Sequence, residues 1–172
     1  TPGAVEWTVA RALRIATEEI PGPVHIDMPQ DVMESPSATE TRNEDQVKIE
    51  DGTEPDVGAV EKALRKARYP VMAVGLTAAR HGLGNGLTTF AERHGIPVVC
   101  TLMGKGVVPD SHPLFLGAVG RARSALIYEA IARADLVLAI GYDPVEINYE
   151  AWMPRAPLVH LDSRPVDIDD MQ

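Results

Sequence analysis

The chain has 172 residues, of which 45% are hydrophobic and 24% charged, and its formal net charge is -9 at pH 7. This composition is that of an ordinary globular protein, and the acidic balance argues against nucleic acid as a partner, because phosphates need clustered Lys and Arg. No apolar run approaches the ~20 residues that a membrane helix requires, so we expect no membrane partner. The single cysteine, Cys100, excludes an internal disulfide and fits a reducing cytosol, so we expect a cytoplasmic protein.

Residues 1–32 predict one helix followed by one strand. Pro21-Gly22-Pro23 ends the helix, and the strand is predicted at Val24 to Asp27. The apolar residues that share one helix face are Val9, Leu13, Ala16 and Ile20. A lone helix and strand cannot bury their own apolar faces, so we interpret residues 1–32 as the tail of a preceding domain. Because the chain starts at Thr1 without an initiator Met, we expect a fragment or a processed chain.

Residues 33–55 are interpreted as an acidic interdomain linker. The sequence there is poor in large apolar residues and is interrupted by Pro36 and Pro55. The acidic residues from 31 to 56 are Asp31, Glu34, Glu40, Glu44, Asp45, Glu50, Asp51, Glu54 and Asp56, against only Arg42 and Lys48. Much of the negative charge of the chain is therefore local.

From Asp56 onward, helices and strands alternate. A capped helix is expected at 56–67, and a second helix is expected to end near Gly95. A third is expected at 127–134 from its apolar stripe. The inward-facing residues of the second helix are Leu83, Leu87, Phe90 and Ala91. The predicted strands are 71–74, 96–99, 136–140 and 158–161, with a short additional strand at 114–116. This alternation predicts an α/β fold with a three-layer, doubly wound parallel sheet over residues 56–172. The glycine cluster 82–86 departs from G-x-G-x-x-G and favours a loosened helix start.

Small and polar residues follow each predicted strand. Because the carboxyl ends of parallel strands share one sheet edge, these residues converge on one crevice, which is the geometry of a nucleotide site. The candidate cofactor-binding residues are Gly75, Thr101, Leu102, Met103, Gly104, Lys105, Gly141, Tyr142, Asp143 and Asp162. The alternative is that glycines at strand ends only permit tight turns. Likewise, Lys105 either meets an anion or is a solvated cation, and Asp162 either accepts ribose hydroxyls or caps the next turn.

No catalytic residue and no metal site is predicted. The five histidines have no metal-ligand spacing with one another or with Cys100, and we interpret them as structural or surface residues. The sequence also has no Gly-x-Ser-x-Gly elbow and no recognisable nucleophile with its base.

Four stretches in register resemble the thiamine diphosphate-dependent enzymes of the acetolactate synthase and pyruvate oxidase family. They are GPVHIDMPQDV at 22–32, TLMGKG at 101–106, HPLFLG at 112–117 and ADLVLAIG at 134–141. In that family a subunit has a pyrimidine-binding domain, a central six-stranded α/β domain and a diphosphate-binding domain. The resemblance implies that residues 1–32 are the end of the first domain and that 56–172 are most of the second, without its last strand. It also implies partners: the two other domains of the same chain, and further copies in a homodimer or homotetramer.

The resemblance also implies what this chain lacks. The cofactor-activating Glu of the family lies in the body of the first domain and the metal-anchoring Gly-Asp-Gly motif in the third, and no Gly-Asp dipeptide occurs here. The parent enzyme is expected to use thiamine diphosphate and Mg²⁺ to decarboxylate pyruvate and to transfer the two-carbon unit to a 2-keto acid. The fragment by itself is expected to be inactive.

One departure from the family concerns FAD. The FAD-binding acetolactate synthases carry an Arg-Phe-Asp-Asp-Arg type stretch where this chain reads Gly141-Tyr142-Asp143-Pro144-Val145-Glu146. This version is similar to the FAD-independent, catabolic type, so binding of FAD or ADP is not expected. Two alternatives stay open: another thiamine diphosphate-dependent 2-keto acid decarboxylase or oxidase, and a stand-alone nucleotide-binding regulatory module.

Overall fold

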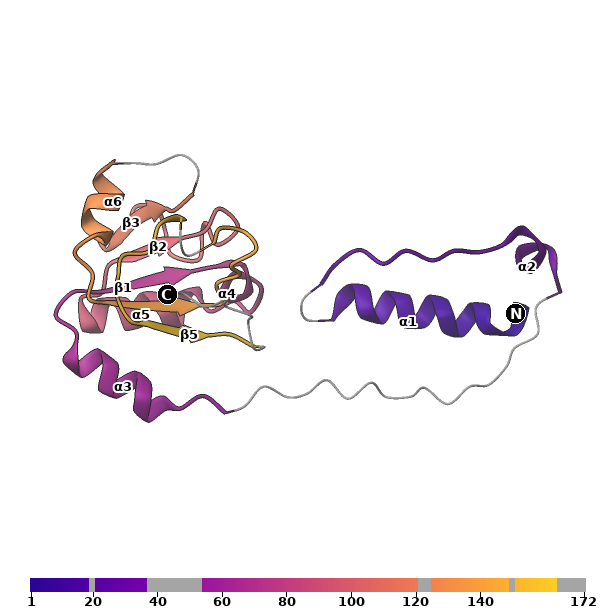
Figure 1. Cartoon of the computed structure of the whole chain (residues 1–172), viewed down its shortest axis with the longest axis horizontal. Helices are drawn as coiled ribbons and strands as arrows, with labels where there is room; N and C mark the ends of the chain where they lie inside the picture. Colours follow the sequence, from indigo (N-terminus) through magenta and orange to yellow (C-terminus); the bar gives the residue numbers. More distant parts are fainter. Residues whose placement is uncertain (19–20, 37–53, 121–124, 149–150, 164–172) are drawn as a thin grey trace. The chain divides into compact units, whose positions relative to one another are not determined.

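The computed structural model describes residues 1–18, 21–36, 54–120, 125–148 and 151–163 (Figure 1). The chain divides into two units, residues 1–50 and residues 51–172, which are described separately.

The first unit contains a 3₁₀ turn at Pro2–Ala4, helix α1 at Val5–Thr17 and helix α2 at Gln30–Glu34. The predicted helix is confirmed as α1, and its last turn is closed by the Thr17 hydroxyl, which donates to the Leu13 carbonyl at 2.9 Å. The strand predicted at 24–27 is wrong, because this segment forms no strand and joins no sheet. A short apolar-rich segment is typical of a strand, but its composition does not show whether a neighbouring strand is present to pair with it.

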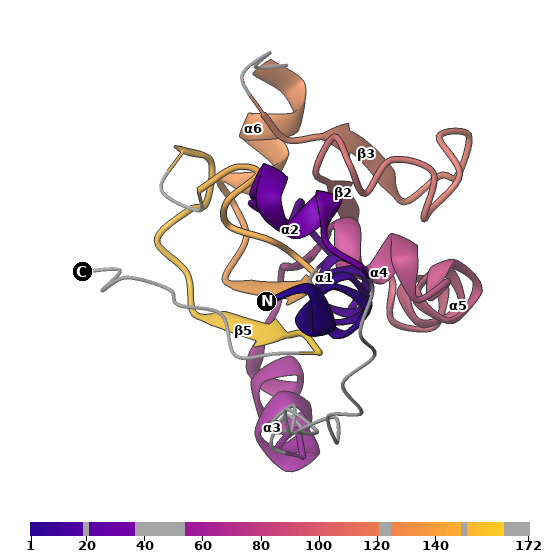
Figure 2. The same cartoon turned by 90° about the vertical axis from the view of Figure 1, so that its right-hand side faces the viewer.

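The second unit is built on one parallel sheet. Its strands are β1 (Pro70–Val74), β2 (Val98–Cys100), β3 (Phe115–Ala118), β4 (Leu136–Ile140) and β5 (Leu158–Leu161). Their order is β3-β2-β1-β4-β5 with every pairing parallel, so β3 and β5 lie at opposite ends of the sheet (Figure 2). The chain winds outward from β1 to β3, crosses over, and continues from β4 to β5. This confirms the predicted doubly wound α/β fold.

Helices pack on both faces of this sheet. Helix α3 (Val57–Lys66) and helix α5 (Gly84–His94) pack against one face, and helix α6 (Ala125–Ile131) packs against the other. The side chain of Asp56 caps α3 by accepting the Ala59 amide at 2.9 Å, and Gly95, at φ +64°, ends α5 in the left-handed conformation. Helix α5 begins at Gly84, within the glycine cluster where a helix start was predicted. Leu83 was predicted to face inward, but it precedes the helix and is 42% exposed.

The central strands are buried on both faces. In β1, Met72 and Val74 face the cluster that contains α3 and α5, whereas Val71 and Ala73 face the cluster that contains α6. This two-sided burial explains why the strands read as continuous apolar runs and not as alternating ones.

Candidate site at the carboxyl edge of the sheet

The carboxyl ends of β1 and β4 lie side by side at the point where the strand order reverses. Val74 pairs with Ile140 in the last register of the two strands. The next residues continue the contact, because the Gly75 amide donates to the Ile140 carbonyl at 3.2 Å and the Thr77 amide donates to the Gly141 carbonyl at 3.1 Å. In open α/β sheets, this reversal point is where ligands bind.

Backbone packs directly against backbone at this point. Helix α4 (Leu76–Arg80), which the sequence did not predict, begins above the end of β4. A Cβ atom at Gly75 would lie 2.4 Å from the Gly141 carbonyl oxygen, and a Cβ atom at Gly141 would lie 2.2 Å from the Ala78 amide nitrogen. Gly141 also has a φ of +56°, which disfavours a side chain. The two glycines therefore have a packing reason to be glycine, and their cofactor-binding role stays a prediction.

The loop after β2 closes over the end of β1. Thr101 is fully buried, its amide donates to the Val74 carbonyl at 2.9 Å, and its Oγ1 accepts the Gly104 amide at 3.0 Å. A Cβ atom at Gly104 would lie 2.6 Å from the Val74 carbonyl oxygen. By contrast, Leu102 and Met103 are 67% and 57% exposed, so this loop presents two apolar side chains to solvent.

Lys105 is paired within its own loop. Its ammonium group contacts the Asp110 carboxylate, and both side chains are more than half exposed. This pairing raises the pKa of Lys105. Nearby, burial raises the pKa of the Cys100 thiol to about 11, an effect that Lys105 partly opposes. Cys100 is therefore a neutral thiol at physiological pH, not a nucleophile.

Tyr142 points into the core. Its side chain is fully buried, its hydroxyl donates to the Ile147 carbonyl at 2.7 Å, and it accepts the Trp152 indole N–H at 2.7 Å. Burial raises its pKa well above the usual range. These contacts tie Ile147 and Trp152 to Tyr142 at the end of β4 and occupy the polar end of Tyr142.

Glu146 joins the loops that follow β2 and β4. Its Oε2 accepts the Met103 amide at 3.3 Å. Its Oε1 is buried and makes no hydrogen bond within the part of the chain that the structure describes. The sequence did not identify Glu146 as a site residue, because nothing local indicates that it reaches a loop 43 positions away.

A histidine and a carboxylate meet at the end of β5. His160 Nε2 lies 3.8 Å from Asp162 Oδ2, and the two side chains are 11% and 7% exposed. The other carboxylate oxygen of Asp162 accepts the Ser163 amide at 2.7 Å. Burial lowers the pKa of His160 and favours the neutral imidazole, an effect that Asp162 opposes. Their i, i+2 spacing places both on one face of the strand, the one sequence signal that could have identified His160.

Carboxylates, which accept hydrogen bonds, outnumber cations among the described residues at the carboxyl edge of the sheet. The described carboxylates after strand ends are Asp110, Asp143, Glu146 and Asp162. The described cations there are Lys105, paired with Asp110, and Arg80, whose guanidinium donates to Thr77 Oγ1 at 3.4 Å. Such an edge fits donors such as hydroxyl groups better than phosphates. Within residues 1–163, gaps aside, no group of three His, Cys, Asp or Glu side chains could hold a metal ion.

No helix in the described ranges is both long enough and apolar enough to cross a membrane.

A doubly wound parallel domain with its glycine-lined reversal point defines a Rossmann-like class of fold. Residues 57–172 match the family model described as "Thiamine pyrophosphate enzyme, central domain". The chain therefore belongs to the thiamine pyrophosphate enzyme family, and the resemblance noted in the sequence is confirmed.

Named relatives agree with this assignment. The chain is 33% identical over 178 residues to the "Probable acetolactate synthase large subunit" of Methanocaldococcus jannaschii, covering 97% of this chain and 30% of that protein. It is 34% identical over 167 residues to the "Acetolactate synthase" of Mycobacterium leprae, covering 93% of this chain and 27% of that protein. The chain thus spans less than a third of the length of these relatives.

A solved structure shares the fold. The "X-ray structure of a putative thiamin diphosphate-dependent enzyme isolated from Mycobacterium smegmatis" superimposes with a TM-score of 0.58 at 22% identity, over 98% of this chain and 31% of that chain.

Proposed function

We propose that this chain is the central part of an acetolactate synthase-like enzyme that decarboxylates pyruvate and transfers the two-carbon unit to a 2-keto acid. The observation that carries the proposal is the family match over residues 57–172 together with relatives named acetolactate synthase at 33–34% identity. Within that enzyme the role of residues 56–172 is to support the assembly of the active sites, and residues 1–32 form the end of the pyrimidine-binding domain.

The residues of this chain do not fit thiamine diphosphate with Mg²⁺. The described part of the chain gathers no three metal ligands, and the carboxyl edge has an excess of carboxylates where a diphosphate needs cations. This supports placing the cofactor in the other domains of the full-length protein, and it supports an inactive isolated chain. We derive no catalytic step for residues 1–172.

The same edge supports a FAD-independent enzyme. Tyr142 uses its hydroxyl within the core, and Glu146 leaves a buried carboxylate oxygen where the loops after β2 and β4 meet. A flavin diphosphate approaching there would meet negative charge. We therefore propose that the full-length protein purifies without stoichiometric flavin. The absorbance spectrum of the purified protein tests this, because flavins absorb between about 350 and 500 nm.

The activity is tested by expressing the reading frame that contains this chain. The full-length protein, supplied with thiamine diphosphate, Mg²⁺ and pyruvate, is expected to form acetolactate, and residues 1–172 alone are expected to form none. Gel filtration of the full-length protein tests the accompanying proposal that it is a homodimer or homotetramer. Activity of the isolated chain would overturn the assignment of the cofactor to the other domains.

A further inference from the structure

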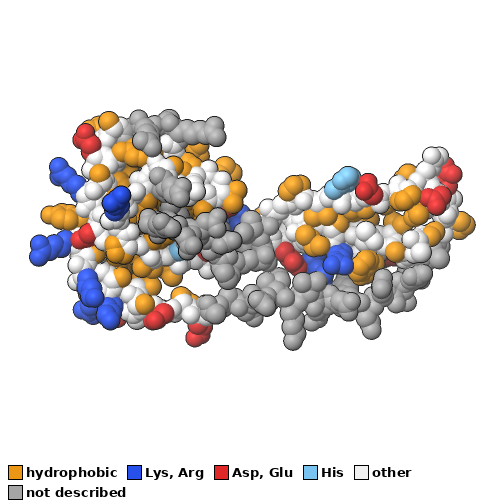
Figure 3. Space-filling view, viewed as in Figure 1, with side chains coloured by type: hydrophobic (Ala, Val, Ile, Leu, Met, Phe, Trp, Pro, Cys, Tyr) orange, Lys and Arg blue, Asp and Glu red, His pale blue; other side chains and the backbone are white. Residues whose placement is uncertain are grey.

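In the second unit, exposed cations lie near the amino ends of the strands, whereas carboxylates follow the carboxyl ends. In the segments that lead into the strands, including the C-terminal halves of α3 and α5, the exposed cations are Lys62, Arg65, Lys66, Arg68, Arg93, Arg133 and Arg155. Lys and Arg side chains gather along this end of the unit in the space-filling view (Figure 3). We call these seven residues the amino-end surface. It is a cationic surface on a chain whose net charge is -9.

Three of the carboxylates near this surface already make contacts within the described part of the chain. Glu61 pairs with Arg65 at 2.5 Å, and Glu92 contacts His112 at 3.1 Å. Asp135 accepts the backbone amides of Arg68 and Tyr69 at 2.8 and 2.9 Å. Within the described residues, Arg65 is the one member of the amino-end surface that has an ion pair. Arg68 interacts electrostatically with Asp135. Among the described residues, the other five cations have no carboxylate ion pair, so their charge can be offered to a partner.

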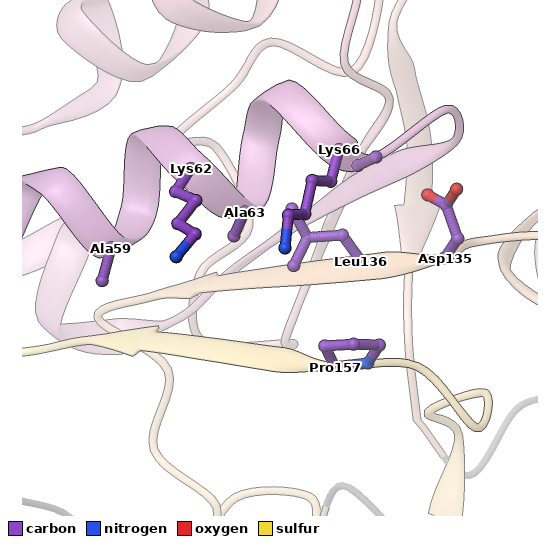
Figure 4. A pocket seen from close by; sticks show the side chains of 8 residues that line it. Ala59, Lys62, Ala63, Lys66, Asp135, Leu136 and Pro157 are labelled. Atoms are coloured by element: carbon purple, nitrogen blue, oxygen red, sulfur yellow. The ribbon is translucent and has the colours of Figure 1, made fainter.

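A hollow with an apolar floor lies within this surface. It measures about 330 Å³ and lies between α3 and the segments that lead into β4 and β5. Its apolar lining is formed by the alanines of α3 together with Leu136 and Pro157 (Figure 4). Its charged lining consists of two cations, Lys62 and Lys66, and one carboxylate, Asp135. Close by in sequence, Tyr69 is 65% exposed beside Arg68. The surface therefore offers apolar area as well as charge.

Helix dipoles explain only part of this arrangement. Cations in the last turn of a helix interact favourably with its carboxyl end, which accounts for Arg65, Lys66 and Arg93. Arg68 and Arg155 instead lie just before strands, where no such dipole requires them. Asp135 already supplies a negative charge near Arg68. Arg155 has no ion pair with a described carboxylate, so it is the one of the two whose presence points to an external anion.

We propose that the amino-end surface binds an acidic polypeptide segment of a partner protein, with an apolar side chain of that segment in the hollow. Carboxylates complement the unpaired cations, and a leucine-sized side chain fits a floor of alanine, leucine and proline. A nucleic acid would match the cations but would supply no aliphatic group for the hollow.

The test uses the whole chain and a 16-residue synthetic peptide of Glu with Leu at every fourth position. Fluorescence anisotropy of the labelled peptide measures binding at several salt concentrations. The variant Lys62→Gln/Lys66→Gln is expected to bind about tenfold more weakly, the effect of losing two charge contacts. The control Arg11→Gln/Lys105→Gln has the same net charge and is expected to bind within about twofold of wild type.

Three further arms decide between interpretations. An all-Glu peptide is expected to bind several-fold more weakly than the Leu-containing one, and a 16-base-pair DNA more weakly still. Circular dichroism confirms that both variants are folded. Equal losses in the two double variants, no binding by wild type, equal binding of the all-Glu peptide, or tighter binding of DNA would each overturn the proposal.

Discussion

Four glycines of the second unit allow the backbone contact between β1 and β4 to be tested by one chemical change, Gly→Ala. Gly141 has both a positive φ and a backbone atom in the way of a Cβ, at 2.2 Å. Gly75 has the close backbone atom, at 2.4 Å, without a positive φ, whereas Gly95 has the positive φ with nothing within 4 Å. Gly86, inside α5, has neither.

The expected changes in the free energy of unfolding follow from these two terms. A left-handed φ costs alanine about 1–2 kcal/mol, so Gly95→Ala is expected to destabilise by that amount. Forcing a methyl group into packed backbone costs about 1–3 kcal/mol, which is the expectation for Gly75→Ala. Gly141→Ala combines both terms, about 2–5 kcal/mol. Gly86 lies in the first turn of α5, so Gly86→Ala is expected to stabilise by at most about 0.5–1 kcal/mol, because alanine has the higher helix propensity.

Urea unfolding followed by tryptophan fluorescence measures these values. Trp152 is buried in the second unit, and a Trp7→Phe background removes the signal from the first. The linear dependence on urea then gives the free energy of unfolding of each variant. The reasoning is refuted if Gly141→Ala lies within about 0.5 kcal/mol of the parent, the size of an ordinary surface change, or if Gly86→Ala is the most damaging of the four.

Three other predictions concern single side chains. Tyr142→Phe leaves the buried Trp152 N–H and Ile147 carbonyl without their present partner, so the free energy of unfolding should fall by about 1–3 kcal/mol in the same urea assay; an unchanged value would contradict the buried hydrogen bonds. Because burial lowers the pKa of His160 from 6.5, the unfolded state binds more protons than the folded state, and the free energy of unfolding should decrease as pH falls through 6.5 and below. The variant His160→Gln should show a weaker pH dependence. Identical pH profiles for the two proteins would contradict this role of His160. Because the pKa of Cys100 is about 11, its thiol should react with Ellman's reagent slowly in the folded chain and rapidly in urea, and fast reaction of the folded chain would show that the thiol is accessible.

The parallel sheet could be predicted because its strands are buried on both faces. Leu136–Ile140 is apolar at every position, and the strand is covered on each side by helices. Helix α4 was missed because its five residues carry too few turns to show a period. The segment 24–27 was predicted as a strand from local composition, and no local pattern reports whether a neighbouring strand is present.

The sequence could place the candidate site at the carboxyl edge of the sheet, but it could not assign a role to each residue there. The glycines after β1 and β4 were recognised as candidate site residues. A side chain is excluded at both positions because backbone packs against backbone there, and this contact exists only because β1 and β4 are neighbours in the sheet. Tyr142 was named because it follows a strand, but the direction of its side chain is set by Trp152, ten positions later. Glu146 and His160 gain their surroundings only through tertiary contacts.

The most direct measurement of the proposed function is the product that the full-length protein forms from [2-¹³C]pyruvate with thiamine diphosphate and Mg²⁺, identified by NMR. The proposal predicts acetolactate labelled at two carbons, since both the transferred unit and the accepting 2-keto acid derive from pyruvate. Labelled acetaldehyde without acetolactate would indicate a simple decarboxylase, and labelled acetate or acetyl phosphate would indicate an oxidase. Either of these results would contradict the proposed reaction while leaving the family of the central domain unchanged.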